Sequence, residues 1–358
     1  MSDLPRRAAS LLTVGFAGKT PDAETTRLLE LGVGGVVLFA RNVEAPAQVA
    51  ELTRELKRRA SAPLLVSIDQ EGGSVARLRT GFTRLPAFRA LGDTADPALA
   101  RELGRVVGSE LAAVGIDWNF APVLDIDTNP ANPVIGARSL AREPERVAEL
   151  GSAFALGLID AGVAPCGKHF PGHGDTRQDS HHELPRLAHA LERLERVELV
   201  PFARAIASGI PALMTAHIVF DALDPERPAS MSPAVVRGLL RKRMGFSGLV
   251  VTDDLEMKAI ADHFAIEDVA LGALAAGVDV LLVCHGAELA RRAIDAIVRG
   301  VQSGAITEAT LNAAAERVAA FAARFARPPL AEFDLTALDS ERHRAVVARV
   351  LSAAGGPA

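Results

Sequence analysis

The sequence predicts an α/β fold, a single (β/α)8 barrel of the TIM type with extra C-terminal helices. Apolar segments of strand length alternate with polar-periodic segments of helix length along most of the 358 residues. The apolar segments are nearly continuous in Val, Leu, Ile and Ala, as expected of parallel strands buried on both faces. Because a helical segment separates each of the eight apolar segments from the next, a closed barrel is the simplest topology.

The expected elements follow one another in regular order. The strands are predicted at Leu11–Phe16, Val33–Phe39, Pro63–Asp69, Asp117–Asp125, Val163–Phe170, Pro211–Ile218, Gly248–Asp254 and Val278–Cys284. The helices between them are predicted at Asp22–Leu31, Pro46–Ala60, Pro97–Val114, Glu145–Ala161, Leu191–Ser208, Pro233–Met244 and Ile266–Ala276. Several of these helices end at a glycine, such as Gly32 and Gly277, where the left-handed backbone of a helix C-terminus favours that residue.

Three more helices are predicted after the last strand, at Ala287–Ser303, Glu308–Ala326 and Ala337–Ala353. The last two lie beyond the barrel, so we expect one catalytic domain over 1–358, with 304–358 as a helical extension packed on it. A doubly wound open sheet is the rival fold. It requires a glycine-rich phosphate loop after the first strand, whereas the glycines Gly32, Gly34 and Gly35 precede a strand.

Composition excludes several classes of function. A net charge of −5 and a pI near 6.0 give no basic field for nucleic acid or for anionic lipid. No apolar run reaches the length of a membrane span. The 14 Phe, one Trp and absent Tyr also leave too few aromatic residues for a membrane belt or a single-strand binding platform. We therefore expect no nucleic-acid partner and no membrane partner.

The two cysteines and the N-terminus bear on the cellular compartment. Cys166 and Cys284 lie in predicted strands and are interpreted as small buried hydrophobic residues, without a disulfide framework. Arg6 and Arg7 precede an apolar run that resembles a short export signal. Because the same run is needed for the first strand, we expect a cytoplasmic protein.

Polar residues collect at the C-terminal ends of the predicted strands, where a barrel of this kind carries its active site. The strand ends supply Asp69, Asp125, Asp127, Lys168, His169, His217, Asp253 and Asp254. A carboxylate at a strand end often caps the next helix, and Asp254 is the best candidate for that structural role. Asp253 lies closer to the strand and is the better candidate for chemistry.

A metal centre is an alternative interpretation of the segment 168–189, which holds five of the nine histidines. His169, His173, His181, His182 and His189 are spaced awkwardly for it, because Pro171 and Gly172 exclude one helical turn between the first two. We expect no metal and no cofactor. The glycines of the segment are typical of an irregular active-site loop, which would carry Asp179 and His181 over the pocket.

Asp179 precedes His181 by two residues, a spacing at which a carboxylate can orient an imidazole and raise its pKa. No Gly-x-Ser-x-Gly nucleophile elbow is present in the sequence. The remaining parts are a strand-end carboxylate as nucleophile, a carboxylate-assisted histidine and a ring of polar side chains suited to sugar hydroxyls. Glycosyl transfer to water fits these parts.

The motifs together resemble those of family-3 glycoside hydrolases, in the bacterial β-N-acetylglucosaminidase branch of muropeptide recycling. The resemblance covers residues from about Val14 to Cys284. It is carried by Ile68-Asp-Gln-Glu-Gly-Gly73 with Arg77, Asn119-Phe-Ala-Pro-Val-Leu-Asp125, Ile135-Gly-Ala-Arg-Ser139, Lys168-His-Phe-Pro-Gly-His-Gly-Asp-Thr176, Asp179-Ser-His181 and Val251-Thr-Asp-Asp-Leu255. The histidine-containing loop is the most specific of these motifs.

The resemblance implies a retaining exo-β-N-acetylglucosaminidase and a role for each matching residue. Asp253 would be the nucleophile, and His181 would be the acid/base, polarised by Asp179. The residues that would bind the N-acetylglucosamine unit in the −1 subsite are Asp69, Arg77, Arg138, Lys168 and His169. The partner implied is a small carbohydrate, either a muropeptide that contains N-acetylglucosamine or a chitooligosaccharide.

Lys168 and His169 pose a geometric problem, because adjacent residues of a regular strand point to opposite faces. Both can reach one sugar only if the backbone departs from the pleat. We therefore predict an irregular backbone near Lys168–Phe170, of which a cis non-proline peptide is one form.

Other functions stay open at this point. A phosphorylase of the same branch would pass the sugar to phosphate instead of water. A metal-dependent barrel hydrolase would be sensitive to chelators, and a sugar-binding protein without catalysis would bind but not turn over. The sequence shows no counterpart of the second domain found in larger family members, and we therefore expect a monomer.

Overall fold

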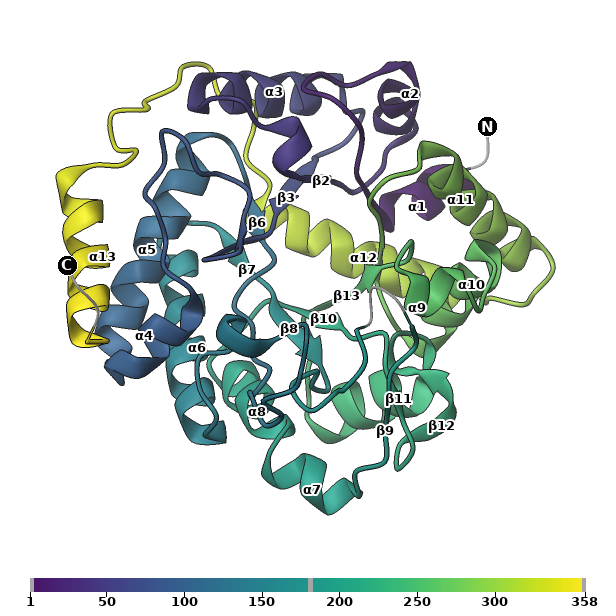
Figure 1. Cartoon of the computed structure of the whole chain (residues 1–358). Coiled ribbons are helices and arrows are strands. Elements are labelled where there is room, and N and C mark those ends of the chain that lie inside the picture. The colour runs from purple at the N-terminus through teal and green to yellow at the C-terminus, as the bar shows by residue number, and fades with distance from the viewer. Residues whose placement is uncertain (1–2, 180–182, 356–358) are drawn as a thin grey trace.

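The computed structural model describes residues 3–179 and 183–355. Its main sheet has the strand order β7-β6-β3-β2-β1-β14-β13-β10-β8, with β7 (Ala164–Pro165) at one end and β8 (Gly167–Phe170) at the other. These two segments are consecutive in the chain and separated only by Cys166, so the sheet closes on itself (Figure 1). Counting β7 and β8 as one strand, the described residues form eight barrel strands. The predicted (β/α)8 barrel is confirmed.

The barrel strands fall within the eight predicted segments and pair in parallel. The other strands are β1 (Leu12–Val14), β2 (Gly35–Leu38), β3 (Leu65–Ile68), β6 (Trp118–Asn119), β10 (Ala212–Thr215), β13 (Leu249–Asp254) and β14 (Val280–Val283). Nearly all their side chains are buried, which explains the continuous apolar runs in the sequence.

The helices surround the barrel, as Figure 1 shows. Those that connect its strands or follow the last one are α2 (Ala23–Leu31), α3 (Pro46–Arg59), α4 (Phe88–Thr94), α5 (Pro97–Ala113), α6 (Pro144–Asp160), α7 (Leu191–Arg196), α8 (Leu199–Ala207), the π-helix η4 (Ala234–Arg243), α9 (Lys258–Ala261), α10 (Ile266–Ala276) and α11 (Ala287–Gln302). Local signals set their ends: Asp22 accepts a hydrogen bond from the Thr25 amide at the start of α2, and Gly32 ends it with a φ of 101°.

Several predicted elements differ from the observed ones: the strand expected over Val163–Phe170 is divided at Cys166, and the helix expected over Pro233–Met244 is a π-helix. The helix expected over Leu191–Ser208 is divided into α7 and α8, because Val197 leaves the helical conformation with φ −127° and ψ −80°. The strand expected over Asp117–Asp125 is regular only in β6. Pro122 has no N–H to donate to a ladder, and the chain pairs with β8 again only at the bridge between Val123 and Lys168.

Several short elements follow the C-terminal ends of the barrel strands. Beyond β3 lies the hairpin of β4 (Gln70–Gly72) and β5 (Val75–Ala76). A separate small sheet contains β9 (Arg186–Leu187), β11 (Val219–Phe220) and β12 (Asp224–Pro228). Single 3-10 turns lie at η1 (Ala40–Asn42), η2 (Gly136–Arg138) and η3 (Ala229–Met231). These segments build the walls above the barrel mouth.

The base of the barrel is covered by α12 (Glu308–Phe325). Its Arg317 donates from Nε to Oδ1 of Asp279 at 2.7 Å, just before β14. Phe321 of the same helix packs on Trp118, with ring centroids 5.1 Å apart. An ion pair and an aromatic contact therefore attach α12 to two different strands.

A second set of contacts holds the chain just beyond α12. The Arg327 backbone donates to Oδ1 of Asp117 at 3.1 Å, and the Lys57 ammonium lies 2.8 Å from the same carboxylate. The Val66 amide donates to its other oxygen at 3.0 Å. Asp117 therefore joins the chain after α12 to α3 and β3.

The two ends of the chain also pack on the barrel helices. The helix α1 (Leu4–Ser10), which the sequence did not predict, lies against α11 and α12, and Arg7 bonds to Asn312 and Glu308. The helix α13 (Glu341–Ala353) lies against α4 and α5.

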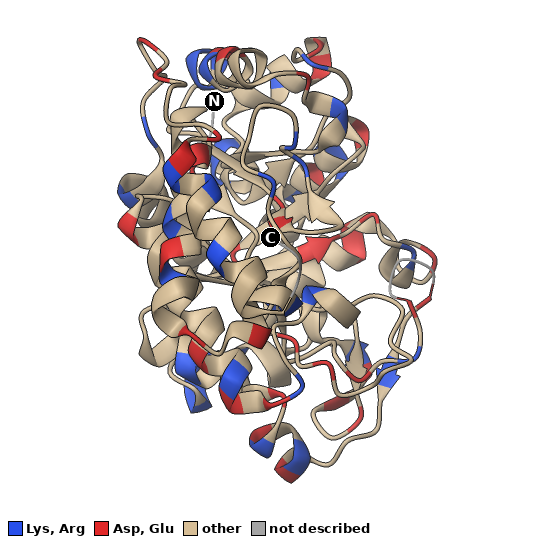
Figure 2. Cartoon of the chain, turned by 60° about the vertical axis from the view of Figure 1, so that its left-hand side comes forward, with Lys and Arg blue, Asp and Glu red and all other residues tan. Residues whose placement is uncertain are grey.

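Charged residues of both signs are spread over the outer helices, as Figure 2 shows. Among the helices that the structure describes, none combines the length and apolar character needed to cross a membrane.

Candidate active site

A cavity of about 350 Å³ opens at the C-terminal ends of the barrel strands. All five predicted sugar-binding residues and the predicted nucleophile line it: Asp69, Arg77, Arg138, Lys168, His169 and Asp253. They come from the ends of β3, β8 and β13 and from the loops after β5 and β6. The barrel topology therefore brings together side chains that are far apart in the sequence.

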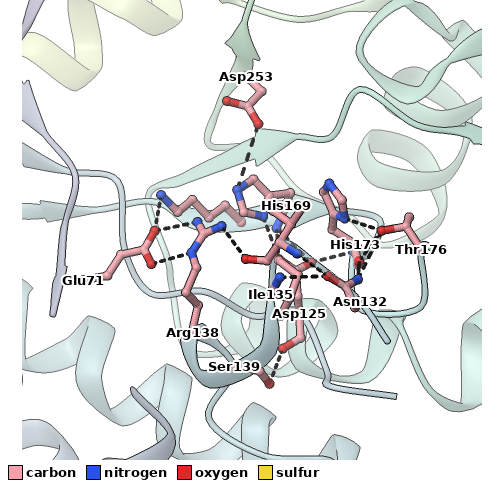
Figure 3. Close-up of polar contacts among 12 residues, drawn as sticks. Glu71, Asp125, Asn132, Ile135, Arg138, Ser139, His169, His173, Thr176 and Asp253 are labelled. Atoms are coloured by element: carbon pink, nitrogen blue, oxygen red, sulfur yellow. Dashed lines mark hydrogen bonds and ion pairs between the residues drawn. The ribbon is translucent and has the colours of Figure 1, made fainter. Parts of the chain in front are cut away.

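The deepest charges belong to a network around Glu71. Arg138 bonds both oxygens of this carboxylate, at 2.9 and 2.8 Å, and the Lys168 ammonium lies 2.7 Å from one of them. Lys168 also donates to Asp69 at 2.6 Å, and Arg77 lies 3.5 Å from the same Asp69 (Figure 3 shows the Glu71 contacts). Lys168 and Glu71 are almost fully buried, with side chains 3% and 1% exposed.

Opposite charges hold this network in its ionised form. Burial raises the pKa of Glu71, but Lys168 and Arg138 outweigh that effect and lower it to about 2. Burial lowers the pKa of Lys168, whereas Asp69 and Glu71 raise it above the ordinary value. Near neutral pH the floor of the cavity therefore presents fixed charges and hydrogen-bond donors.

A second buried carboxylate, Asp125, positions two histidines. Its Oδ2 lies 2.6 Å from Nδ1 of His169, and its Oδ1 accepts the backbone amide of His173 at 2.7 Å (Figure 3). The contact at Nδ1 of His169 leaves Nε2 directed toward Asp253, 4.0 Å away. Burial and the neighbouring His169 lower the pKa of His173 to about 4, so this ring is neutral near pH 7.

Asp253 lies at the end of β13, on the wall of the cavity. Burial raises the pKa of Asp253, but the interactions with His169, His217 and Lys168 and a hydrogen bond from the Asp254 amide together lower it. The carboxylate is therefore ionised at neutral pH. An ionised carboxylate beside imidazoles and a cation is suited to act as a nucleophile or as an electrostatic stabiliser.

The loop after β8 is held by side-chain hydrogen bonds. Asn132 donates to the His173 carbonyl at 2.8 Å and to the Thr176 hydroxyl at 3.1 Å. Nε2 of His189 lies 2.7 Å from Asp175, which places His189 in a supporting contact with this loop. The described part of the loop continues to the half-buried Asp179, whose carbonyl accepts the Glu183 amide. His181 and His182 lie outside the described residues.

The backbone prediction at Lys168 is confirmed. The peptide bond between Lys168 and His169 is cis, and both side chains line the cavity. The bonds Phe170–Pro171 and Ala121–Pro122 are also cis.

One group of metal-ligating side chains occurs among the described residues, at Asp254, Glu256 and His285, with ligand atoms within 4.8 Å of one another. Its carboxylates already accept backbone hydrogen bonds. Asp254 accepts the amides of Glu256 and Cys284 at 3.1 and 3.2 Å, and Glu256 accepts those of His285 and Gly286. The helix cap expected of Asp254 is not observed, because the next helix, α9, has Met257 at its N-cap and no side-chain capping bond; Asp254 instead holds the turn after β13 against the end of β14.

Two residues that organise the site are not among the predicted site residues. Glu71 and Asp125 lie inside the family motifs, and Asp125 is among the strand-end residues expected near the active site, but neither of them is given a role from the sequence. Both are buried carboxylates that contact the predicted residues rather than the cavity itself. The signals that point to them are the strand-end position of Asp125 and the spacing of Asp69 and Glu71, which places two carboxylates two residues apart.

A closed barrel with an ionised carboxylate at its mouth, set among fixed cations and imidazoles, defines a barrel enzyme built for sugar chemistry. The model for the glycosyl hydrolase family 3 N-terminal domain matches residues 4–321. The chain belongs to glycosyl hydrolase family 3. It is an enzyme, a glycoside hydrolase of the β-hexosaminidase type.

Named relatives agree with this assignment. A β-hexosaminidase of Thiobacillus denitrificans is 45% identical over 275 residues, which are 75% of this chain and 76% of the relative. The structure of a family 3 β-N-acetylglucosaminidase from a Paenibacillus species superposes with a TM-score of 0.94 at 44% identity, over 99% of this chain and 69% of that one. NagZ from Neisseria gonorrhoeae, in complex with N-trifluoroacetyl-D-glucosamine, gives a TM-score of 0.77 at 34% identity, over 96% and 97% of the two chains.

Proposed function

We propose that the protein is a retaining exo-β-N-acetylglucosaminidase that releases terminal N-acetylglucosamine from peptidoglycan fragments. The observation that carries this proposal is the ionised carboxylate of Asp253 on the cavity wall, facing the cluster of Asp69, Lys168, Arg138 and His169. An anion in contact with a pocket that is otherwise rich in hydrogen-bond donors matches a nucleophile beside a sugar subsite.

In the first step, Asp253 attacks the anomeric carbon while the glycosidic C–O bond breaks. The leaving oxygen takes a proton from His181. In the second step, His181 removes a proton from water, the water attacks the anomeric carbon, and the bond to Asp253 breaks. Two inversions at one carbon retain the β configuration.

We assign the role of orienting the acid/base to Asp179, which precedes His181 by two residues. A histidine in place of a second carboxylate alters the usual two-carboxylate scheme. A carboxylate beside the ring raises the imidazole pKa, so that it can donate a proton near neutral pH.

The −1 subsite is proposed to be Asp69, Arg77, Arg138, Lys168 and His169. Asp69 and Lys168 share a contact of 2.6 Å and both line the cavity, so together they offer an acceptor and a donor to adjacent sugar hydroxyls. The hydrogen bond that Nδ1 of His169 donates to Asp125 fixes the ring and orients its Nε2 toward the same space.

The test is hydrolysis of an aryl N-acetyl-β-glucosaminide with a chelator present. We expect turnover that resists the chelator and falls at least about 10³-fold in Asp253→Asn. Asp160→Asn, which changes an exposed carboxylate on α6, is the matched control and should retain activity. A loss below about tenfold in Asp253→Asn would contradict the nucleophile assignment.

The stereochemistry and the acceptor need separate measurements. Proton NMR of the first product should show the β anomer of N-acetylglucosamine, and an initial α anomer would exclude a retaining mechanism. Turnover is compared in buffers with and without inorganic phosphate. Formation of the sugar 1-phosphate would show a phosphorylase instead of a hydrolase.

We further propose that the enzyme is a cytoplasmic monomer. Residues 4–14 form α1 and β1 and pack within the fold, which supports an interpretation of this segment as part of the working enzyme. Cell fractionation with mass analysis of the N-terminus tests the location. Sedimentation equilibrium of the purified chain tests the oligomeric state.

A further inference from the structure

The cavity opens beside His285, at the end of β14. Among the described residues that line the cavity, His285 is the single one that is largely exposed, with a side chain 58% accessible to solvent. The charged inner wall, by contrast, is buried or half-buried. His285 therefore marks the rim, where a substrate longer than one sugar leaves the cavity.

The volume of the cavity makes the rim important. About 350 Å³ is near the lower limit of small-molecule sites, which span roughly 300 to 1,000 Å³. One hexosamine fits such a space, and the unit on the leaving side of the scissile bond must then lie against the rim.

The imidazole of His285 is held in a fixed orientation despite its exposure. It stacks on Phe39, with ring centroids 5.8 Å apart and an interplanar angle of 29°. Its Nδ1 lies 3.5 Å from Asp254 and 3.7 Å from Glu256. An exposed side chain ordinarily samples many rotamers, so three contacts make this ring a preorganised surface.

Phe39 packs against one face of the His285 ring. Eleven of the 14 phenylalanines are buried, and of the three that are partly exposed, Phe39 is the one that lines the cavity. The Arg41 guanidinium lies 4.4 Å from the centre of the Phe39 ring and bonds to the carbonyls of Phe16 and Cys284. The stack therefore rests on an arginine that is fixed to the barrel.

We infer that the stacked pair of Phe39 and His285 is the platform on which the first unit of the leaving group lies. This inference rests on the proposed function, since it places the aglycone side of the same site. Flat rings suit the apolar C–H face of a pyranose. The pair is therefore a specificity-determining element for substrates whose leaving group is a sugar.

The experiment compares two substrates that differ in the leaving group, di-N-acetylchitobiose and methyl N-acetyl-β-glucosaminide. For His285→Ala, the loss of kcat/KM on the disaccharide should exceed the loss on the methyl glycoside by about tenfold. His285→Phe, which keeps a ring at the rim, should restore most of the lost discrimination. His263→Ala is the matched control, because His263 is an exposed histidine that also pairs with a phenylalanine, Phe264, outside the cavity. It should leave both rates unchanged.

Equal losses on the two substrates in His285→Ala would overturn the platform while leaving the proposed function intact. Failure of His285→Phe to recover the disaccharide rate would also overturn it, because stacking would not be the cause. Wild-type enzyme that hydrolyses neither substrate would overturn the proposed function and the platform together.

Discussion

The two ends of the barrel both bury carboxylates, but they bind them differently. At the base, Asp279 receives hydrogen bonds from Arg241 at 2.6 Å, Arg317 at 2.7 Å and the Val250 amide at 2.8 Å. At the mouth, Asp253 accepts the Asp254 amide on one oxygen, while its other oxygen lies 4.0 Å from His169. The base uses its carboxylates for internal bonds, whereas the mouth keeps one directed into a cavity.

The pKa values follow the same division. Burial raises the pKa of Asp279 and of Asp117, although cations and backbone amides oppose it. At the mouth burial is outweighed, and the pKa values of Asp125 and Asp253 lie below the ordinary range. Proximity to cations is common to both ends. The mouth adds imidazoles and Lys168, whose charges lower the pKa values of Asp125 and Asp253 below the ordinary value.

The largest expected effect separates activity from stability at the mouth. Asp253→Asn should lower kcat/KM by at least about 10³-fold. The free energy of unfolding should change by less than about 1 kcal/mol, because the asparagine oxygen can still accept the hydrogen bond from the Asp254 amide. Urea unfolding and steady-state kinetics on the same preparation measure both quantities. A large loss of stability would show that Asp253 is a structural residue like those at the base.

The base should behave in the opposite way. Asp279→Asn leaves Arg241 and Arg317 without their shared counter-charge, so the free energy of unfolding should fall by about 3–5 kcal/mol. The folded variant should keep kcat/KM within roughly twofold of the wild type, because the change lies at the far end of the barrel. A selective loss of kcat in fully folded protein would break the comparison between the two ends.

A pH effect of similar size is expected from His173 at the mouth. Its pKa is about 4 in the folded protein against 6.5 unfolded, so the unfolded chain binds the extra proton as the pH falls below 6.5. Stability is complete above pH 6.5 and declines by on the order of 3 kcal/mol down to pH 4. Urea unfolding across this range should show a shallower decline in His173→Gln, and identical slopes would contradict the assignment.

The smallest change in stability is expected for an ion pair on the outer helices, which serves as the reference for the buried pairs. Asp160 on α6 pairs with Arg101 and Arg105 of α5, and all three side chains are substantially exposed. Asp160→Asn should cost less than about 1 kcal/mol, and that cost should shrink in high salt. A cost as large as that of Asp279→Asn would mean that burial does not explain the difference.

The barrel was predictable because continuous apolar runs that alternate with helical segments fit few folds besides a parallel barrel. The division of β7 from β8 and the shortness of β6 could not be predicted, because the effect of Pro122 and Pro165 on the backbone hydrogen bonds between strands depends on the neighbouring strands. The motifs identified Asp69, Arg77, Arg138, Lys168 and His169 as cavity residues, and geometry supports their grouping. Their catalytic and binding roles stay predictions, as do those of Asp253, Asp179 and His181.

The buried supports were harder to foresee. Asp117 and Asp279 lie at the starts of strands, where an acidic residue in a sequence is indistinguishable from an ordinary turn residue. The stack of Phe39 on His285 joins the ends of β2 and β14, which no local pattern connects. Such pairs depend on tertiary contacts alone.

The contacts that Asp279 and Asp117 make with Arg317 and the Arg327 amide have a consequence for synthesis of the chain on the ribosome. When β14 has emerged, all barrel strands exist, but Asp279 still lacks Arg317 and Asp117 still lacks the Arg327 amide. At that stage Asp279 is held by Arg241 and the Val250 amide, and Asp117 by Lys57 and the Val66 amide, so each carboxylate has only part of its final set of partners. The segment through Arg327 completes the base of the barrel, and a chain shortened before α12 is expected to be less stable than the full chain.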